Sequence, residues 1–489
     1  MRIWQSIIRS NQQLFSPSRY RVCVPLQAVI ISVTSLLAIS LACRILPPEL
    51  GRVALAGLFA LQLCFEVRRG ERNFLLSPAF LLAFVVLMAF SIIPSFLHQV
   101  LSWFDPLEVP SDDNLYLALP RLIIISYFGS QAESWILTFS AAGLTLHALI
   151  RTLCGNAVEK SPATGIRRDY YRTYMFAFSA LFTILFIFQT QTVFLSSSMT
   201  AFFQTFFGPI QSFVLLFLLR SEMSRKQSHR IGVLLLFCAA IVAMVLAKQF
   251  KVPILMVLSA IIYHIATVQI SFRRVISTIL LCVFLFIFIL QLVGIARDQG
   301  HGNIEKFQRL SAEKLSALFI SKVVWRQTET GFCLNNVLRS HADDDFDAVK
   351  QTFWLKILVP RVLWPEKPNF SQGAEYAVNY CKMPTLTSHS ASITLLGQPV
   401  IEGGVPGLLI HGSILLFFLG GATALAFRRP GLTRVVVFAL LPWWIDFDQD
   451  FALYFGNIVK FGLCMTPLML ISSVSLKQRS ISSAGRLGR

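Results

Sequence analysis

The sequence predicts an all-α membrane protein: a polytopic bundle of about twelve transmembrane helices with one large helical loop outside the membrane. The first observation is composition, because 55% of the 489 residues are hydrophobic, only 14% are charged and the mean hydropathy is +0.64. Soluble domains carry about a quarter charged residues, and one aqueous core could not bury this much apolar surface. The second observation is the recurrence of apolar runs near the ~20 residues that a helix needs to cross a bilayer. The third is the placement of positive charge between these runs.

The apolar runs are spaced along most of the chain. They lie at 22–43, 50–66, 77–97, 131–150, 174–194, 201–219, 231–247, 252–271, 275–295, 405–427, 432–445 and 451–474. The first run is too long for the apolar core of a cleaved signal peptide, so we expect it to stay in the membrane. The organisation predicted from these runs is nine transmembrane helices in 1–295, a large loop in 296–404, three helices in 405–475 and a basic tail in 476–489.

Positive charge predicts the orientation of the chain. The net charge of +18 would indicate nucleic-acid binding in a soluble protein, but here the basic residues gather in short loops between apolar runs. Basic clusters follow the second, fourth, sixth, eighth and tenth runs and fill the C-terminal tail. Because cytoplasmic loops are enriched in Lys and Arg, these loops and both termini are predicted to be cytoplasmic, and no nucleic-acid partner is expected. The large loop at 296–404 then faces outward.

The large outward loop carries the most distinctive motif. Loops of this length are either functional or disordered, and the helical spacing of its apolar residues favours a folded one. Within it, LVPRVLWPEKPNF (358–370, called the hook below) contains three prolines that stiffen a corner presenting Arg361 and Lys367. Cys333 and Cys381 lie on the same loop, where an oxidising compartment would permit a disulfide; two buried thiols are the alternative.

PRVLWPEKP (360–368), Gly373 and TSHSASITLLGQPVIEGGVPGLLI (387–410) resemble the Wzy-type bacterial polysaccharide polymerases, which are related to the O-antigen ligases. The resemblance implies a GT-C-like glycosyltransferase of the bacterial inner membrane. Such an enzyme joins oligosaccharide repeat units on the periplasmic face. Donor and acceptor are both glycans on undecaprenyl diphosphate, a chain-length regulator and a flippase are further partners, and no cofactor is implied.

The chemistry of that reaction assigns roles to residues of the loop. The departing diphosphate needs fixed cations, and arginine binds phosphate in a bidentate manner. The predicted diphosphate-binding residues are Arg361, Lys367, Arg309, Arg326 and Arg297. An acceptor hydroxyl needs a proton acceptor, for which the predicted catalytic residues are His389, Glu366 and Glu329, with Glu402 as a rival. The predicted sugar-binding residues are Trp364, Trp325, Tyr376, Ser388 and Ser390. The alternative for all of them is a solvated loop with an aromatic belt at the membrane interface.

Two short motifs near the last helices are open to more than one interpretation. In WWIDFDQD (443–450), Asp446 and Asp448 form a D-x-D that can hold a divalent cation beside a diphosphate, although a solvated turn is the simpler interpretation. Gly403, Gly404 and Gly407 are expected at a helix entrance, where a lipid headgroup or another helix approaches closely.

Two other functions are compatible with parts of the predicted topology and loop composition. A ligase would use the same donor site but pass the glycan to a different lipid acceptor. A transporter or flippase for lipid-linked sugar would concentrate charged residues inside the spans near the bilayer midplane. The spans here are nearly free of charge and the cations gather in one outward loop, so the sequence favours the polymerase.

Overall fold

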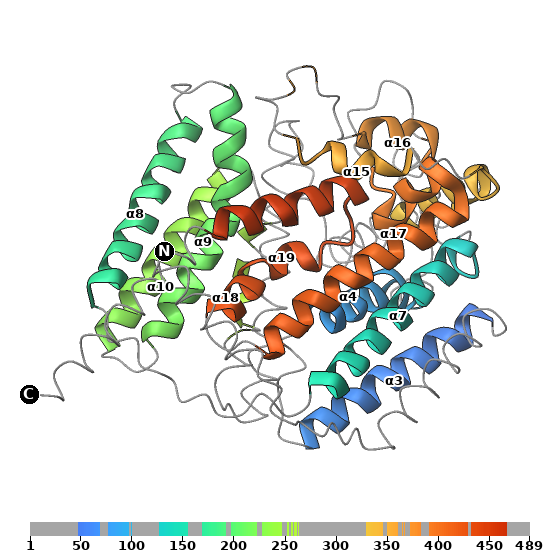
Figure 1. The fold of residues 1–489 in the computed structure, drawn as a ribbon, viewed down its shortest axis with the longest axis horizontal. Helices are drawn as coiled ribbons and strands as arrows, with labels where there is room; N and C mark the ends of the chain where they lie inside the picture. The colour runs from blue at the N-terminus through green and yellow to red at the C-terminus, as the bar shows by residue number, and fades with distance from the viewer. Residues whose placement is uncertain are drawn as a thin grey trace, which may run out of the picture.

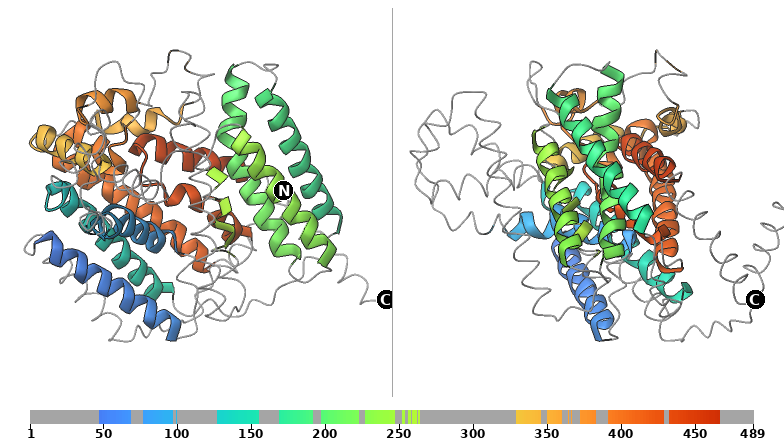
Figure 2. Two further views of the ribbon diagram at one scale, coloured as in Figure 1. Left: turned by 180° about the vertical axis from the view of Figure 1, so that it is seen from behind. Right: turned by 90° about the vertical axis from the view of Figure 1, so that its left-hand side faces the viewer.

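In the computed structural model the described part of the chain is helical and contains no strand (Figures 1 and 2). The described residues are 47–68, 77–96, 99, 127–154, 169–191, 197–222, 227–246, single positions within 252–263, 329–345, 350–359, 364, 366, 372–382, 391–428 and 432–466. The predicted all-α class is therefore confirmed for this part of the chain.

In the described residues the N-terminal half supplies six helical stretches. They are α3 (Pro48–Arg68), α4 (Pro78–Leu87) continued by the π-helical turn η2 (Met88–Ile92), α7 (Gln131–Cys154), α8 (Asp169–Gln191), α9 (Ser197–Glu222) and α10 (Gln227–Leu246). The loop supplies a helix at 329–341, η4 (Lys350–Thr352), α15 (Phe353–Lys356) and α16 (Gly373–Asn379). The C-terminal part supplies α17 (Thr394–Arg428), α18 (Leu432–Ala439), α19 (Leu441–Trp444) and a last helix, Phe451–Thr466.

Several of these helices suit a lipid bilayer. Pro78–Phe96, Gln131–Cys154 and Thr394–Phe427 are long and apolar enough to cross one, and four shorter apolar helices accompany them. Large apolar side chains point outward from the bundle, including Phe417, which is 77% exposed, and Val53, which is 70% exposed. Such surface is stable against lipid tails and not against water. A helical membrane protein is thus confirmed, whereas the count of about twelve spans and their orientation stay predictions.

The helices form two packed groups. α3, α4, α7 and α17 pack together, α8 packs with α9 and α10, and α18 touches both α9 and α17 and so joins the groups (Figure 1). Buried side chains from both groups belong to one continuous apolar core. Where α8 meets α9, the Gln211 amide donates to the Ser179 carbonyl and to Thr183 Oγ1, each at 3.0 Å. A polar side chain in a bilayer needs such internal partners.

Small residues bring α4 and α7 into close contact. Gly143 of α7 faces Ala79 and Ala83 of α4; a Cβ at position 143 would lie 2.8 Å from the Ala83 Cβ and 3.2 Å from the Ala79 carbonyl oxygen. The start of α4 is fixed by Ser77, whose hydroxyl accepts from the Phe80 N–H at 3.2 Å. Helices in membranes associate through such small-residue contacts, because lipid offers no hydrophobic drive between them.

The two last predicted runs fold as a bent hairpin. The run at 432–445 is divided at Leu440 into α18 and α19, and the following turn leads into Phe451–Thr466. In Figure 1 this last helix lies across the upper part of the bundle, between α9 and α15. Its aromatic side chains account for that path, since Phe455 lies 4.5 Å from the Trp354 ring and Phe461 lies 4.9 Å from the Trp443 ring.

We predict that Gly143→Ala destabilises the protein by about 1 to 3 kcal/mol, because the added methyl overpacks the contact with Ala83. Thermal unfolding of the purified protein in detergent measures the change. The matched control is Gly57→Ala on α3, where a Cβ meets no atom within 4 Å. The control should be neutral or stabilising, since Ala is the better helix former. Equal thermal unfolding midpoints for Gly143→Ala and Gly57→Ala would contradict the close α4–α7 contact.

Candidate functional site

The described part of the large loop is one connected unit, called the loop segment below (residues 329–345, 350–359 and 372–382). A disulfide between Cys333 and Cys381 joins the 329–341 helix to the end of α16, with a Cα–Cα distance of 4.7 Å. The Asn336 amide donates to the Tyr380 carbonyl at 2.7 Å, and His341 Nε2 lies 2.9 Å from the Tyr380 hydroxyl. The alternative of two buried thiols is therefore wrong for this pair.

The loop segment rests on a break in α17. Gly403 and Gly404 leave helical geometry, and Gly404 has a φ of +62° that favours glycine. A Cβ at Gly404 would lie 2.6 Å from the Asp344 carbonyl oxygen and 3.0 Å from that of Ala342. The Val405 N–H, freed by the break, donates to the Ala342 carbonyl at 3.2 Å. The predicted close approach at the glycine run is confirmed, and the approaching element is the end of the 329–341 helix.

Beneath the loop segment lies the turn 445–450, between α19 and the last helix. Phe447 is 1% exposed and packs on the rings of Phe90 and Phe139, at 5.2 and 5.4 Å. Its carbonyl accepts from the Leu395 N–H at 3.2 Å, which fixes the turn to the first residues of α17. The solvated turn considered for WWIDFDQD is therefore wrong. Because Phe447 packs in the core, the nearby Asp446 and Asp450 are buried with it.

Three carboxylates of this turn form the aspartate cluster (Asp446, Asp448 and Asp450). Asp446 and Asp450 are each 6% exposed, and Asp448 is half-buried. Thr330 of the loop segment lies with its Oγ1 3.5 Å from Asp448 Oδ1, so the cluster meets the loop segment directly. Among the described residues no group of three His, Cys, Asp or Glu side chains is placed to hold a metal ion.

Asp450 occupies the cap position of the last helix but does not act as its cap. Its backbone carbonyl accepts from the Tyr454 N–H at 2.9 Å, which begins the helix. A capping carboxylate would accept from the N–H of Ala452 or Leu453. The Ala452 N–H donates instead to Gln398 Oε1 of α17, at 3.0 Å. Burial raises the pKa of the Asp450 carboxyl to about 7, and the neighbouring Asp448 adds to the rise.

Tyr376, predicted to bind sugar, lies in the core of the loop segment. It is 4% exposed, and its hydroxyl donates to Gln372 Oε1 at 2.8 Å. Burial, followed by the Asp450 carboxylate, raises the pKa of its phenol. A sugar stacks on an open aromatic face, so this buried ring fits a structural role better than the predicted one.

The other predicted site residues fall into two sets. Glu329 is 3% exposed beside Thr330, Trp364 is half-buried and Glu366 is exposed. The remaining ones lie outside the described residues: Arg361, Lys367, Arg309, Arg326, Arg297, His389, Trp325, Ser388 and Ser390. Of the predicted catalytic carboxylates, Glu329 is thus the one whose neighbour in sequence, Thr330, contacts the aspartate cluster.

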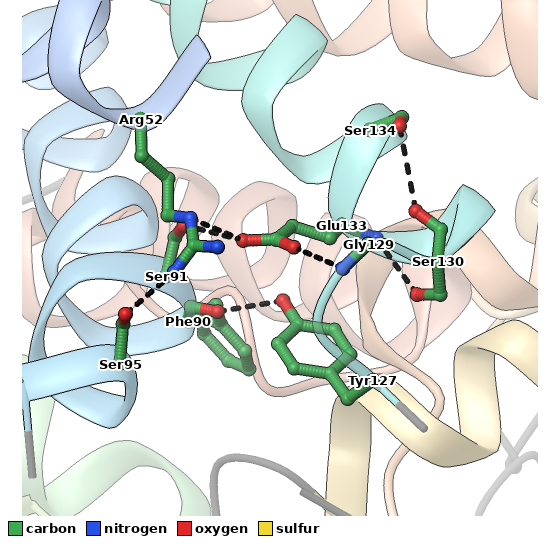
Figure 3. A network of polar contacts seen from close by, with 9 residues as sticks. All are labelled: Arg52, Phe90, Ser91, Ser95, Tyr127, Gly129, Ser130, Glu133 and Ser134. Atoms are coloured by element: carbon green, nitrogen blue, oxygen red, sulfur yellow. Dashed lines mark hydrogen bonds and ion pairs between the residues drawn. The ribbon is translucent and has the colours of Figure 1, made fainter. Parts of the chain in front are cut away.

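Sequence reasoning missed a buried ion pair at the same end of the bundle (Figure 3). Arg52 Nε of α3 lies 3.1 Å from Glu133 Oε1 of α7, and the Arg52 guanidinium lies 5.0 Å from the centre of the Phe128 ring. Glu133 also accepts from Ser91 Oγ at 2.9 Å and from the Gly129 N–H at 2.8 Å. The sequence offered one signal for it. Arg52 and Glu133 carry opposite charges near the starts of the runs 50–66 and 131–150, and the predicted topology places both starts on the outer side of the membrane.

Tyr127 connects this ion pair to the loop segment. Its hydroxyl donates to the Phe90 carbonyl at 2.6 Å, next to the ion pair (Figure 3). On the other side its ring fills the space where a side chain at Gly331 would stand. The ion pair, Tyr127 and the 329–341 helix therefore form one connection between membrane helices and loop segment.

Comparisons of the chain with protein-family models, with curated proteins and with solved structures found no match.

We predict that the double variant Cys333→Ala, Cys381→Ala loses about 4 kcal/mol of unfolding free energy, because the disulfide closes a loop with a sequence separation of 48 residues. Thermal unfolding measures the loss, and an electrophoretic mobility difference between reduced and non-reduced wild type reports the bond. Cys238→Ala, at an exposed free cysteine, is the matched control and should match wild type. A double variant as stable as this control would contradict the structural role of the bond.

We predict that Asp450→Asn stabilises the protein at alkaline pH. The unfolded carboxyl has a pKa near 3.9 and the folded one a pKa of about 7, so the folded state binds more protons between these values. Wild-type stability should then fall as the pH rises from about 4 to about 7, and the variant should lack this fall. The expected advantage is about 1 to 4 kcal/mol at pH 8 and negligible near pH 4. Thermal unfolding across pH tests this, and parallel curves for the two proteins would contradict it.

Proposed function

We propose that this protein is a membrane glycosyltransferase that polymerises undecaprenyl-diphosphate-linked repeat units on the periplasmic face of the bacterial inner membrane. The observation that carries the proposal is the loop segment, a disulfide-tied helical unit that is fixed to the membrane helices above a buried aspartate cluster. A structural disulfide belongs to an oxidising compartment, which supports the outward orientation derived from the charges. Carboxylates at the boundary of loop and bundle lie where a lipid-linked headgroup would have to react.

In the proposed mechanism, the hook supplies cations that bind the leaving diphosphate. Arg361 and Lys367, with Arg309, Arg326 and Arg297, are proposed to neutralise the diphosphate as it leaves the anomeric carbon. Fixed cations of this kind act mainly in the transition state, where the negative charge grows. The lipid chains of donor and acceptor remain in the bilayer, so both reactive headgroups are confined to the same layer above it. His389, Glu366 and Glu329 stay as proposed proton acceptors of this mechanism.

The polymerase, ligase and transporter alternatives can be distinguished by the lipid-linked glycan that accumulates when the protein is lost. A ligase uses the same donor but transfers the glycan to another lipid, so its loss leaves long polymer on undecaprenyl diphosphate. Loss of a transporter traps single repeats on the cytoplasmic face. Loss of a polymerase leaves single repeats on the periplasmic face.

We predict that Arg361→Ala lowers polymerisation by about 100-fold or more, because one fixed charge at a transition-state anion contributes that much. Cells that lack the native gene and express each variant are compared by the chain length and the membrane face of their lipid-linked glycans. Arg361→Lys should recover part of the activity, since lysine keeps the charge but loses bidentate binding. Arg339→Ala, at an exposed arginine of the 329–341 helix, is the matched control and should stay fully active. Normal chain length in Arg361→Ala would contradict the clamp, and single repeats on the cytoplasmic face would favour transport.

A further inference from the structure

Asp450 is the least satisfied acidic group of the described site. It is 6% exposed and lies where the loop segment, α17 and the last helix meet. Its carboxylate has no hydrogen-bond donor among the described residues, although a buried carboxylate in a finished core is normally paired. The two other members of the aspartate cluster take part in contacts of their own, so this property belongs to Asp450 alone among the three.

Gln398 takes one of the two N–H groups that could cap this carboxylate. An aspartate at the first position of a helix usually binds the N–H two or three residues later, which lowers its free energy as an anion. Here Gln398 takes the Ala452 N–H at 3.0 Å. This side chain of α17 thereby occupies one of the two donors that would make Asp450 a structural cap.

A second buried polar group lies at the end of α19, just before the turn 445–450. Trp444 is 7% exposed, and its indole Nε1–H has no hydrogen-bond partner in the described part of the chain. The indole can only donate and the Asp450 carboxylate can only accept when ionised. A sugar hydroxyl can both accept and donate a hydrogen bond, so its chemistry matches what each of these groups lacks.

We propose that Asp450 is the general base that activates the acceptor hydroxyl, and that Gln398 is the positioning residue that keeps its carboxylate free for this task. This inference rests on the proposed glycosyltransferase function. It names a proton acceptor that differs from His389, Glu366 and Glu329. Of these, Glu329 is buried and engaged in other contacts, and Glu366 is exposed to solvent.

The proposed step balances as a substitution at the anomeric carbon. The acceptor oxygen forms a bond to the anomeric carbon of the donor glycan while the bond from that carbon to the diphosphate oxygen breaks. The electron pair of the broken bond leaves with undecaprenyl diphosphate. The proton of the acceptor hydroxyl passes to the Asp450 carboxylate and from there to water, so no oxidant, reductant or metal enters the balance.

The groups around Asp450 set the pH range in which it can act. Asp448 of the same turn faces it, Tyr376 of α16 faces it from the loop segment, and Glu402 of α17 acts on the same tyrosine. Burial, followed by the charge of Asp448, raises the Asp450 pKa to about 7. A base with a pKa near the working pH combines ionisation with a useful proton affinity.

The test uses the full-length protein in proteoliposomes and the lipid-linked repeat that accumulates in cells lacking the gene. Asp450→Asn should lower the turnover number by about 100-fold or more at unchanged KM. Asp343→Asn, at an exposed aspartate of the loop segment, is the matched control and should keep wild-type turnover. Thermal unfolding and the Cys333–Cys381 disulfide verify that each variant is folded.

A second variant reports on the role of Gln398. Gln398→Ala frees the Ala452 N–H for Asp450, which should lower its pKa and move the acidic limb of the pH–rate profile to lower pH by about one unit. A merely structural glutamine would lower activity without moving that limb. Asp450→Asn with turnover within threefold of wild type, or an unmoved limb in Gln398→Ala, overturns the inference while leaving the glycosyltransferase in place. A wild-type protein that makes no polymer overturns both.

Discussion

The structure depends on how α17 satisfies its backbone where it breaks. A break at Gly403 and Gly404 frees the Val405 N–H from the helix, so this donor needs another acceptor. The Ala342 carbonyl at the end of the 329–341 helix accepts this N–H, which at the same time fixes the loop segment to the bundle. Pro406 fits because it stands in the first turn of the second half of α17, where no intrahelical N–H is needed. One hydrogen bond therefore satisfies both helix ends and brings the loop segment over the aspartate cluster.

Besides the hydrogen bond from Val405 to Ala342, two polar connections hold the loop segment to the membrane helices. On one side, the ion pair of Arg52 and Glu133 holds α3 to α7 and reaches the 329–341 helix through Tyr127. On the other, the turn 445–450 is held by α17 and meets Thr330. A buried ion pair contributes geometry more than net stability, because desolvation offsets most of its attraction. The ion pair therefore contributes more to a fixed geometry at one end of the bundle than to net stability.

Within the described residues, apolar runs predicted several of the helices, whereas most of their contacts were not predictable from the sequence. The run at 405–427 corresponds to the part of α17 after the break, because twenty apolar residues in lipid have no other way to satisfy their backbone. The close approach at Gly404 was also predicted, since glycines at a helix entrance have few other uses. The run at 432–445 was predicted as one span but is divided at Leu440, where the packing of Trp443 on Phe461 decides the path. For the candidate site, the pattern D-x-D drew attention to Asp446 and Asp448, whereas the free carboxylate belongs to Asp450.

By itself the sequence determined that this is a helical membrane protein with a folded loop between its ninth and tenth apolar runs, because hydropathy, charge placement and proline are local properties of the chain. The tertiary structure decided that Cys333 and Cys381 are bonded and not two thiols, which backbone approaches Gly404, and which aspartate is left without a donor. The physical reason is that each of these outcomes depends on a partner far away in the chain. The Ala452 N–H, one of the two donors for an Asp450 cap, binds Gln398, which lies more than fifty residues earlier in the chain, and no pattern around either residue records that contact.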